Sequence, residues 1–155
     1  MAYLQSLDGV GGGKILQVQH VQQTGGWSST SNQKDTFLSK TITPGSTSNH
    51  ILIQITSKYQ YPAGSKTHGW CPSAIFRDTT NLGTGSPLIS GAEYYMGDDT
   101  PQRNMQQYIS IAHIDTVPAA TEVTYHFKVG SNYGFAISMG TADMWLTEIS
   151  GGVGD

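Results

Sequence analysis

The 155-residue sequence has little charge, a single cysteine and no long apolar run. Because Cys71 has no partner, an intrachain disulfide framework is excluded, and we expect a protein made in a reducing cytosol that is stabilised by packing or association. Charged residues make up 12% of the chain, the net charge is −3, and the only arginines are Arg77 and Arg103. Without a basic patch, nucleic acid is not an expected partner. No apolar run approaches the roughly 18 residues of a membrane span, and the first ten residues lack the features of a secretory signal, so no membrane partner is expected either.

What the chain does have is glycine, serine, threonine and a recurring strand pattern. Period-two alternation returns about every ten residues, with turn clusters rich in Gly, Pro, Asn and Ser between the segments. No segment has the period of a helix. The composition and spacing predict an all-β fold, a β-sandwich or jelly roll of about eight to nine short antiparallel strands. The expected strands are 14–23, 35–43, 50–61, 74–80, 92–97, 106–116, 122–129, 135–139 and 142–150.

The strongest strand signal follows a turn at Pro44 and Gly45. Ile51, Ile53 and Ile55 alternate with more polar neighbours and predict one buried face. Leu52 falls on the opposite face. Together with Ile15 and Ile109 on other strands, it suggests that some strands carry apolar residues on both faces. Apolar residues on both faces of a strand are typical of a protein that shares its surface with neighbours, so we expect an obligate oligomer.

The chain divides into three parts on composition. Residues 1–13 predict an N-terminal arm with a glycine hinge, residues 14–150 the β-sandwich domain, and residues 151–155 a flexible C-terminal tail. The arm carries Tyr3, Leu4 and Leu7, too few apolar groups to fold alone. We expect it to anchor the protein to a neighbouring subunit or another partner, by strand addition or by burying Tyr3 and Leu4.

Signatures of catalysis and of metal binding are weak. GVGGGK (9–14) resembles a phosphate loop, but Asp8 and Ile15 occupy the places of the required Gly and Ser or Thr, and a hinge is favoured. His113 and His126 lie on strands that could be neighbours, so they form either one shared site or two separate hydrogen-bonding histidines.

Two further candidates have an ordinary structural explanation beside the chemical one. Cys71 is either a nucleophile near His68 or a buried structural thiol, and the latter is favoured because its segment is rich in turn residues. Asp98 and Asp99 are either a calcium site or a solvated loop pair. We therefore expect no catalytic residue, no metal, no cofactor and no enzymatic activity.

Four aromatic residues, Trp27, Trp70, Tyr94 and Tyr95, are expected in or beside loops. Such residues provide rigid contact area with a polar tip, which suits binding of carbohydrate or protein. They could equally cover the open ends of a sandwich. Both interpretations stay open from the sequence.

The order of several motifs resembles a known family. GGGKILQVQHVQQ is followed by a Ser/Thr-rich loop and FLSKTITPGSTSNHILIQI, then AIFRDTTNLG, YISIAHIDTVPAATEVTYHFKV and a closing MWLTEIS. Over residues 13–150 this resembles a β-sandwich module of tailed-bacteriophage virion surface proteins, in which a hairpin around Pro44, an Arg-Asp strand and a hairpin around Pro118 are typical. Neither Cys71 nor the loop of Trp70 belongs to that pattern.

The resemblance implies a location on the virion surface, with assembly in the host cytoplasm, and no catalytic residues. Members are frequently trimers. With its short arm, the chain is expected to be an oligomeric cement or decoration protein, a homotrimer that binds the major capsid protein or another virion protein and stabilises the shell. The alternative is a tail- or head-fibre tip module that binds a host receptor or surface glycan. An enzyme, such as a depolymerase or a cupin-like metal enzyme, is disfavoured.

Overall fold

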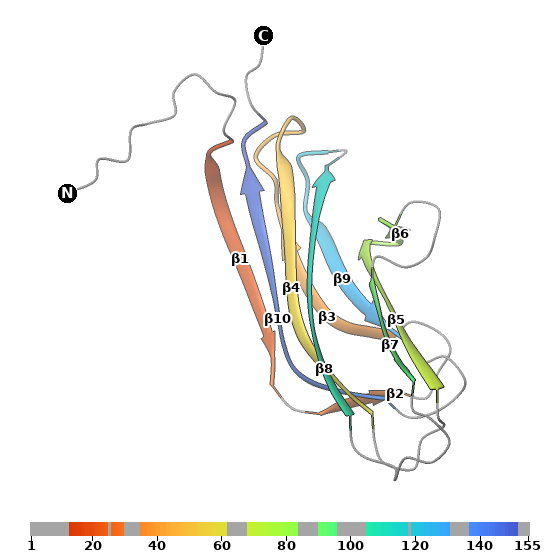
Figure 1. The fold of residues 1–155 in the computed structure, drawn as a ribbon. Helices are drawn as coiled ribbons and strands as arrows, with labels where there is room; N and C mark the ends of the chain where they lie inside the picture. Colours follow the sequence, from red (N-terminus) through yellow and green to blue (C-terminus); the bar gives the residue numbers. More distant parts are fainter. Residues whose placement is uncertain are drawn as a thin grey trace, which may run out of the picture.

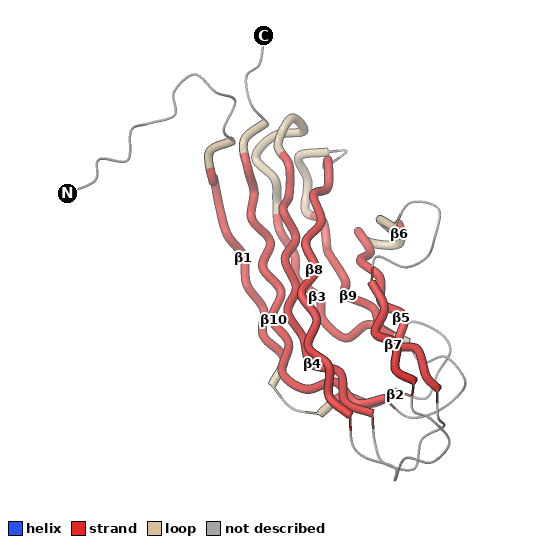
Figure 2. The backbone as a smooth tube through the Cα atoms, viewed as in Figure 1, coloured by secondary structure: helices blue, strands red, loops and turns tan. Residues whose placement is uncertain are grey.

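A computed structural model describes residues 13–24, 26–29, 35–61, 68–83, 90–95, 105–117, 119–130 and 137–151. For some strand residues, among them Trp27, Trp70, Cys71, Tyr94 and Tyr95, it describes the backbone alone. Figure 2 shows that the described chain is strand and loop, without a helix. The strands are β1 (Ile15–Gln23), β2 (Trp27–Ser29), β3 (Asp35–Ile42), β4 (His50–Tyr61), β5 (His68–Arg77), β6 (Thr80–Asn81), β7 (Ser90–Tyr95), β8 (Met105–Thr116), β9 (Val123–Val129) and β10 (Ile137–Ile149).

Two antiparallel sheets face each other, as Figure 1 shows. Sheet A has the order β1-β10-β4-β8, with β2 also paired to β10, and sheet B has the order β3-β9-β5, with β6 and β7 both paired to β5. If only the eight longer strands are numbered along the chain, the orders are 1-8-3-6 and 2-7-4-5. This is the strand order of a jelly roll, so the all-β sandwich predicted from the sequence is confirmed.

The core lies between the sheets and follows from period two. Along β9, Val123, Tyr125, Phe127 and Val129 are buried, while the residues between them are partly exposed. Ile51, Ile53 and Ile55 of β4 have no exposed surface, as their spacing predicts. The β10 side chains Met144 and Leu146 complete the wall that sheet A presents to sheet B.

Two connections that the sequence presents as hairpins join different sheets. β3 and β4, on either side of Pro44, belong to sheets B and A, and β8 and β9, on either side of Pro118, belong to sheets A and B. In a jelly roll the partner of a strand is distant in sequence, and here β3 pairs with β9 and β4 with β10. The expectation of local hairpins at these two places is therefore wrong.

Several strand positions also differ from expectation. The predicted strands 135–139 and 142–150 form one strand, β10, interrupted by a bulge between Met139 and Ala142. β5 starts at His68, inside the segment 62–73 expected to be a connection, and β2 lies inside the expected loop 24–33. Pro72 is compatible with β5 because pairing to β9 starts only at Ser73.

Two buried carboxylates tie segments together that are distant in sequence. Glu148 of β10 accepts hydrogen bonds from the Gly45 amide (2.7 Å), Asn49 Nδ2 (2.6 Å) and Gln17 Nε2 (2.6 Å), which fixes the turn after β3 to sheet A. Burial raises the pKa of Glu148, and the three hydrogen bonds lower it by a larger amount. The pKa of Glu148 therefore lies below its ordinary value.

The second carboxylate, Asp115 of β8, joins the two sheets. Its oxygens accept hydrogen bonds from Arg77 Nη1 of β5, at 2.8 and 2.9 Å, and from the hydroxyl of Tyr125 of β9, at 2.7 Å. Burial and this hydrogen bond to Asp115 both raise the pKa of Tyr125. Asp78 follows Arg77 with φ of 51° and accepts a hydrogen bond from the Thr124 amide. The Arg-Asp pair singled out in the sequence therefore has a structural role, as a cross-sheet clamp and a turn.

No helix in the described chain is long and apolar enough to cross a membrane.

Candidate binding face on the outer side of sheet A

The side of sheet A that faces away from sheet B, here called the outer face, carries apolar side chains that the fold leaves exposed. Val18, Thr147, Leu52 and Ile114 are cross-strand neighbours and form a row across all four main strands. Val18 and Ile114 are 53% and 61% exposed. Residues of this kind gathered on one face are typical of a contact surface.

This group extends to the start of β1. A bulge between Ile15 and Gln17 breaks the pairing of β1 with β10, and both Ile15 and Leu16 are exposed. We refer to Ile15, Leu16, Val18, Leu52 and Ile114 as the apolar band. It occupies the end of sheet A at which the described chain begins and ends, where the Lys14 and Ser150 backbones are hydrogen-bonded.

The middle of the outer face holds a polar and aromatic cluster. The rings of His20 and Trp145 are stacked, with centroids 4.9 Å apart and planes 18° apart. His20 Nε2 and Gln22 Nε2 each lie 2.9 Å from Oδ1 of Asp143. Because β1 and β10 position all four residues, the Asp143 carboxylate is held in a fixed orientation.

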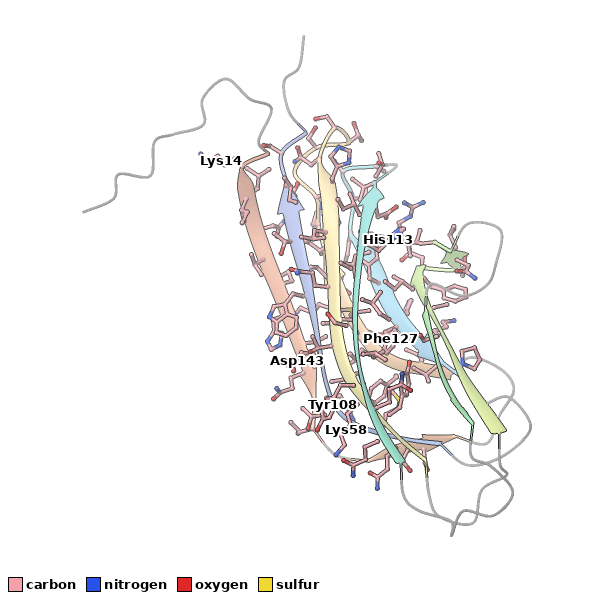
Figure 3. All side chains as sticks on the ribbon, in the orientation of Figure 1. Lys14, Lys58, Tyr108, His113, Phe127 and Asp143 are labelled. Carbon is pink, nitrogen blue, oxygen red and sulfur yellow. The ribbon has the colours of Figure 1, made fainter. Side chains whose placement is uncertain are left out.

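The opposite end of the outer face contains a hollow of about 480 Å³. We call this site the hollow. Figure 3 labels Tyr108, Lys58 and Asp143 at this end of the sheet. The lining residues come from β4, β8 and β10, and they are Thr56, Ser57, Tyr108, Ile109, Ser110, Thr141 and Asp143.

The bulge in β10 shapes this hollow. Tyr59 pairs with Met139 and Ser57 with Ala142, so that Gly140 and Thr141 together oppose Lys58 alone. A Cβ on Gly140 would lie 3.4 Å from Lys58 Cδ, which shows that the lysine stem packs closely on this glycine. The Lys58 ammonium lies 5.8 Å from the centre of the Tyr108 ring.

The four aromatic residues expected to form a contact surface are divided between the two sheets. The Trp27 backbone pairs with Met139 in sheet A, whereas Trp70 pairs with Glu93 in sheet B. Tyr94 and Tyr95 pair with Gly69 and His68 on the same β5–β7 ladder. All four backbones lie in strands, with Trp27 at the start of β2 and Tyr95 at the end of β7. Whether they contact a ligand stays a prediction.

The two histidines considered as a shared site lie in different sheets. His113 of β8 is a neighbour of Ile53 in sheet A, whereas His126 of β9 belongs to sheet B and is hydrogen-bonded to Ser39 Oγ at 2.7 Å. Burial and the nearby Lys128 charge lower the pKa of His126. They are therefore separate histidines. Among the described residues no three side chains of His, Cys, Asp or Glu are grouped to hold a metal.

Several other expectations fall outside what the structure describes. These are the arm residues Tyr3, Leu4 and Leu7, the pair Asp98 and Asp99, and the side chains of Cys71 and His68.

The prediction of apolar residues on both faces of sheet A is correct for Ile15 and Leu52. On β8, Ile109 is partly buried against the core and Ile114 is exposed on the opposite face, so this strand too has apolar residues on both faces. Ile114 and Tyr108, on the other face of the same strand, are its exposed large hydrophobic residues. Alternation along residues 106–116 indicates two faces, but only the pairing of β8 with β4 identifies which one is outside.

No family model and no curated protein matches the sequence. Among solved structures, the chain is similar to dimeric latent PorU from Porphyromonas gingivalis, with 10% sequence identity and a TM-score of 0.33. That alignment covers 90% of this chain and 11% of the other, so this chain spans about a tenth of the length of that protein. The likeness is too low to bear on function.

Proposed function

We propose that the chain is a structural protein of a bacteriophage virion, an oligomeric cement or decoration protein that binds the capsid surface and stabilises the shell. The observation that carries this proposal is the apolar band. Ile15, Leu16, Val18 and Ile114 are exposed on the outer face, with Leu52 half-buried beside them, although the core between the sheets is already filled by other residues. Viral capsid proteins often use the jelly roll, which agrees with the motif resemblance, although a fold alone does not assign a function.

The apolar band has the composition expected of a stable protein–protein interface. Burial of one side chain such as Val18 or Ile114 contributes about 1.5–3 kcal/mol, and an oligomer engages several such residues at once. β1 begins directly after the arm, so the arm and the exposed residues Ile15 and Leu16 form one continuous partner-binding segment in this proposal. A homotrimer is the expected oligomer.

The test places a charge in the band. Val18→Lys and Ile114→Lys should each weaken self-association and binding to stripped capsids about tenfold or more, because each exchanges a buried apolar contact for a buried charge. Gln106→Lys is the matched control, since it adds the same charge to an exposed residue of β8 outside the band. Sedimentation equilibrium and particle pull-down measure the two effects. A wild-type protein that stays monomeric at micromolar concentration and does not bind capsids would refute the proposal.

A second function, a fibre-tip module that binds a receptor or glycan, is favoured by the hollow instead. Copy number per particle separates the two, because decoration requires hundreds of copies and fibres require few.

A further inference from the structure

The hollow combines three kinds of chemistry at one end of sheet A. Tyr108 offers an aromatic ring that is 75% exposed. Thr56, Ser110 and Thr141 contribute side-chain hydroxyls, and Asp143 contributes a carboxylate. An exposed aromatic ring beside hydroxyls and a charged acceptor is a combination that neither a purely apolar ligand nor a simple ion would use fully.

The carboxylate is oriented and has acceptor capacity left. Both hydrogen bonds to Asp143, from His20 and Gln22, involve Oδ1, and among the described residues Oδ2 accepts none. A carboxylate oxygen fixed in this way accepts strong hydrogen bonds from ligand hydroxyl groups.

The aromatic ring has a cationic neighbour. The Lys58 ammonium lies beside the Tyr108 ring, and the lysine stem is packed on Gly140 of the bulge. The bulge therefore shapes the hollow and positions the lysine whose ammonium lies beside its aromatic residue.

We infer that the hollow binds a neutral saccharide, with the C–H face of a pyranose ring on Tyr108 and its hydroxyls on Asp143, Thr56 and Thr141. The volume is within the range of small-ligand sites, about 300–1,000 Å³, and leaves room for a short saccharide. Among the described residues the Asp143 carboxylate offsets the cation Lys58, which disfavours polyphosphates and nucleic acid. Asp143 is also the only acidic residue among the described lining residues, which disfavours a metal ion.

This site goes beyond the proposed capsid role and is independent of it. Tyr108 lies six residues along β8 from Ile114, about 20 Å at the rise of a strand. A partner that covers the apolar band can therefore leave the hollow open. Variants at the two places separate the two functions: Ile114→Lys tests the band, and Tyr108→Ala tests the hollow.

The experiment titrates the full chain with neutral disaccharides built from glucose, galactose, mannose and N-acetylglucosamine, with sialyllactose as an acidic probe. Amide chemical shifts in NMR report the contact. We expect at least one neutral disaccharide to shift amides of residues 56–58, 108–110 and 141–143 at millimolar concentration. Tyr108→Ala and Asp143→Asn should each weaken that binding about tenfold or more.

Ile114→Ala is the matched control, because it truncates an exposed side chain on the same face and strand outside the hollow, and its saccharide binding should be unchanged. The inference is overturned if no neutral disaccharide perturbs the three segments, if only sialyllactose does, or if folded Tyr108→Ala binds as well as the wild type. Folding of each variant is checked by its amide spectrum.

Discussion

Exchanging Glu148 for glutamine should destabilise the sandwich strongly at neutral pH and little in acid. Oε1 of Glu148 accepts hydrogen bonds from the Gly45 amide and Asn49 Nδ2, and Oε2 accepts one from Gln17 Nε2. A glutamine has the same shape but only one oxygen. Its NH2 group must then face at least one of these three donors, and the hydrogen bonds that remain lose their charge assistance.

The magnitude follows from these contacts. Loss of one hydrogen bond to a charged, buried group costs about 1.5–3 kcal/mol, and weakening of the others brings the total to about 3 kcal/mol. For a domain of this length, that corresponds to a decrease in Tm of about 6–12 °C. The stability of such domains is about 5–15 kcal/mol, so the variant should still fold.

The pH dependence identifies the cause. The folded-state pKa of Glu148 is lowered, so its stabilising contribution is complete above the unfolded-state pKa of about 4.3 and is lost as the pH falls through the folded value. The difference between wild type and variant should therefore shrink below pH of about 4.

Urea unfolding from pH 7 into the acid range measures this difference, with Glu122→Gln at an exposed position as the control. A gap of constant size from neutral to acid pH would show that shape, not charge, governs this site, and the reasoning would fail.

Three further predictions concern other parts of the chain. Asp115→Asn should lower the free energy of unfolding by about 3 kcal/mol in urea titrations. The half-buried Arg77 loses its counter-ion, and an NH2 group replaces one of the two oxygens that accept from Arg77 and Tyr125; an unchanged midpoint would contradict the clamp. In His126→Gln the decrease in Tm from pH 7 to pH 5 should be smaller than in the wild type. The pKa of His126 is lowered in the folded state, so protonation below pH of about 6.5 favours the unfolded chain of the wild type. An equal decrease in Tm in both proteins would count against this explanation. Deleting residues 1–10 should leave the sandwich folded but weaken capsid pull-down, and full-strength binding would move the anchor elsewhere.

The sequence predicts individual strands well where one face is buried. Ile51, Ile53, Ile55 and the alternating residues of β9 are buried as their period requires. Burial against a core imposes period two on the residue types, so the pattern is visible without knowledge of the partner strand.

Which strands pair is decided by contacts distant in the chain, and the sequence carries little sign of it. His113 and His126 are close in sequence, yet the connection between them crosses from one sheet to the other. The hollow could not be foreseen for the same reason. Tyr108, Thr56 and Asp143 come from three strands that the register alone brings together, and Gly140-Thr141 has the composition of a turn although it forms a bulge.

The bulge in β10 also makes this strand tolerant of a change in length. Met139 and Ala142 both point into the core although three positions separate them, because one residue between them is extra. Removing Gly140 would restore a regular alternation and leave every remaining side chain on its present face. The same deletion in the regular stretch from Ala142 to Ile149 would turn over one part of the strand and expose core residues. Natural or engineered variants of this chain can therefore gain or lose the bulge by a single-residue insertion or deletion that leaves the core packing unchanged. The shape of the hollow would change with it.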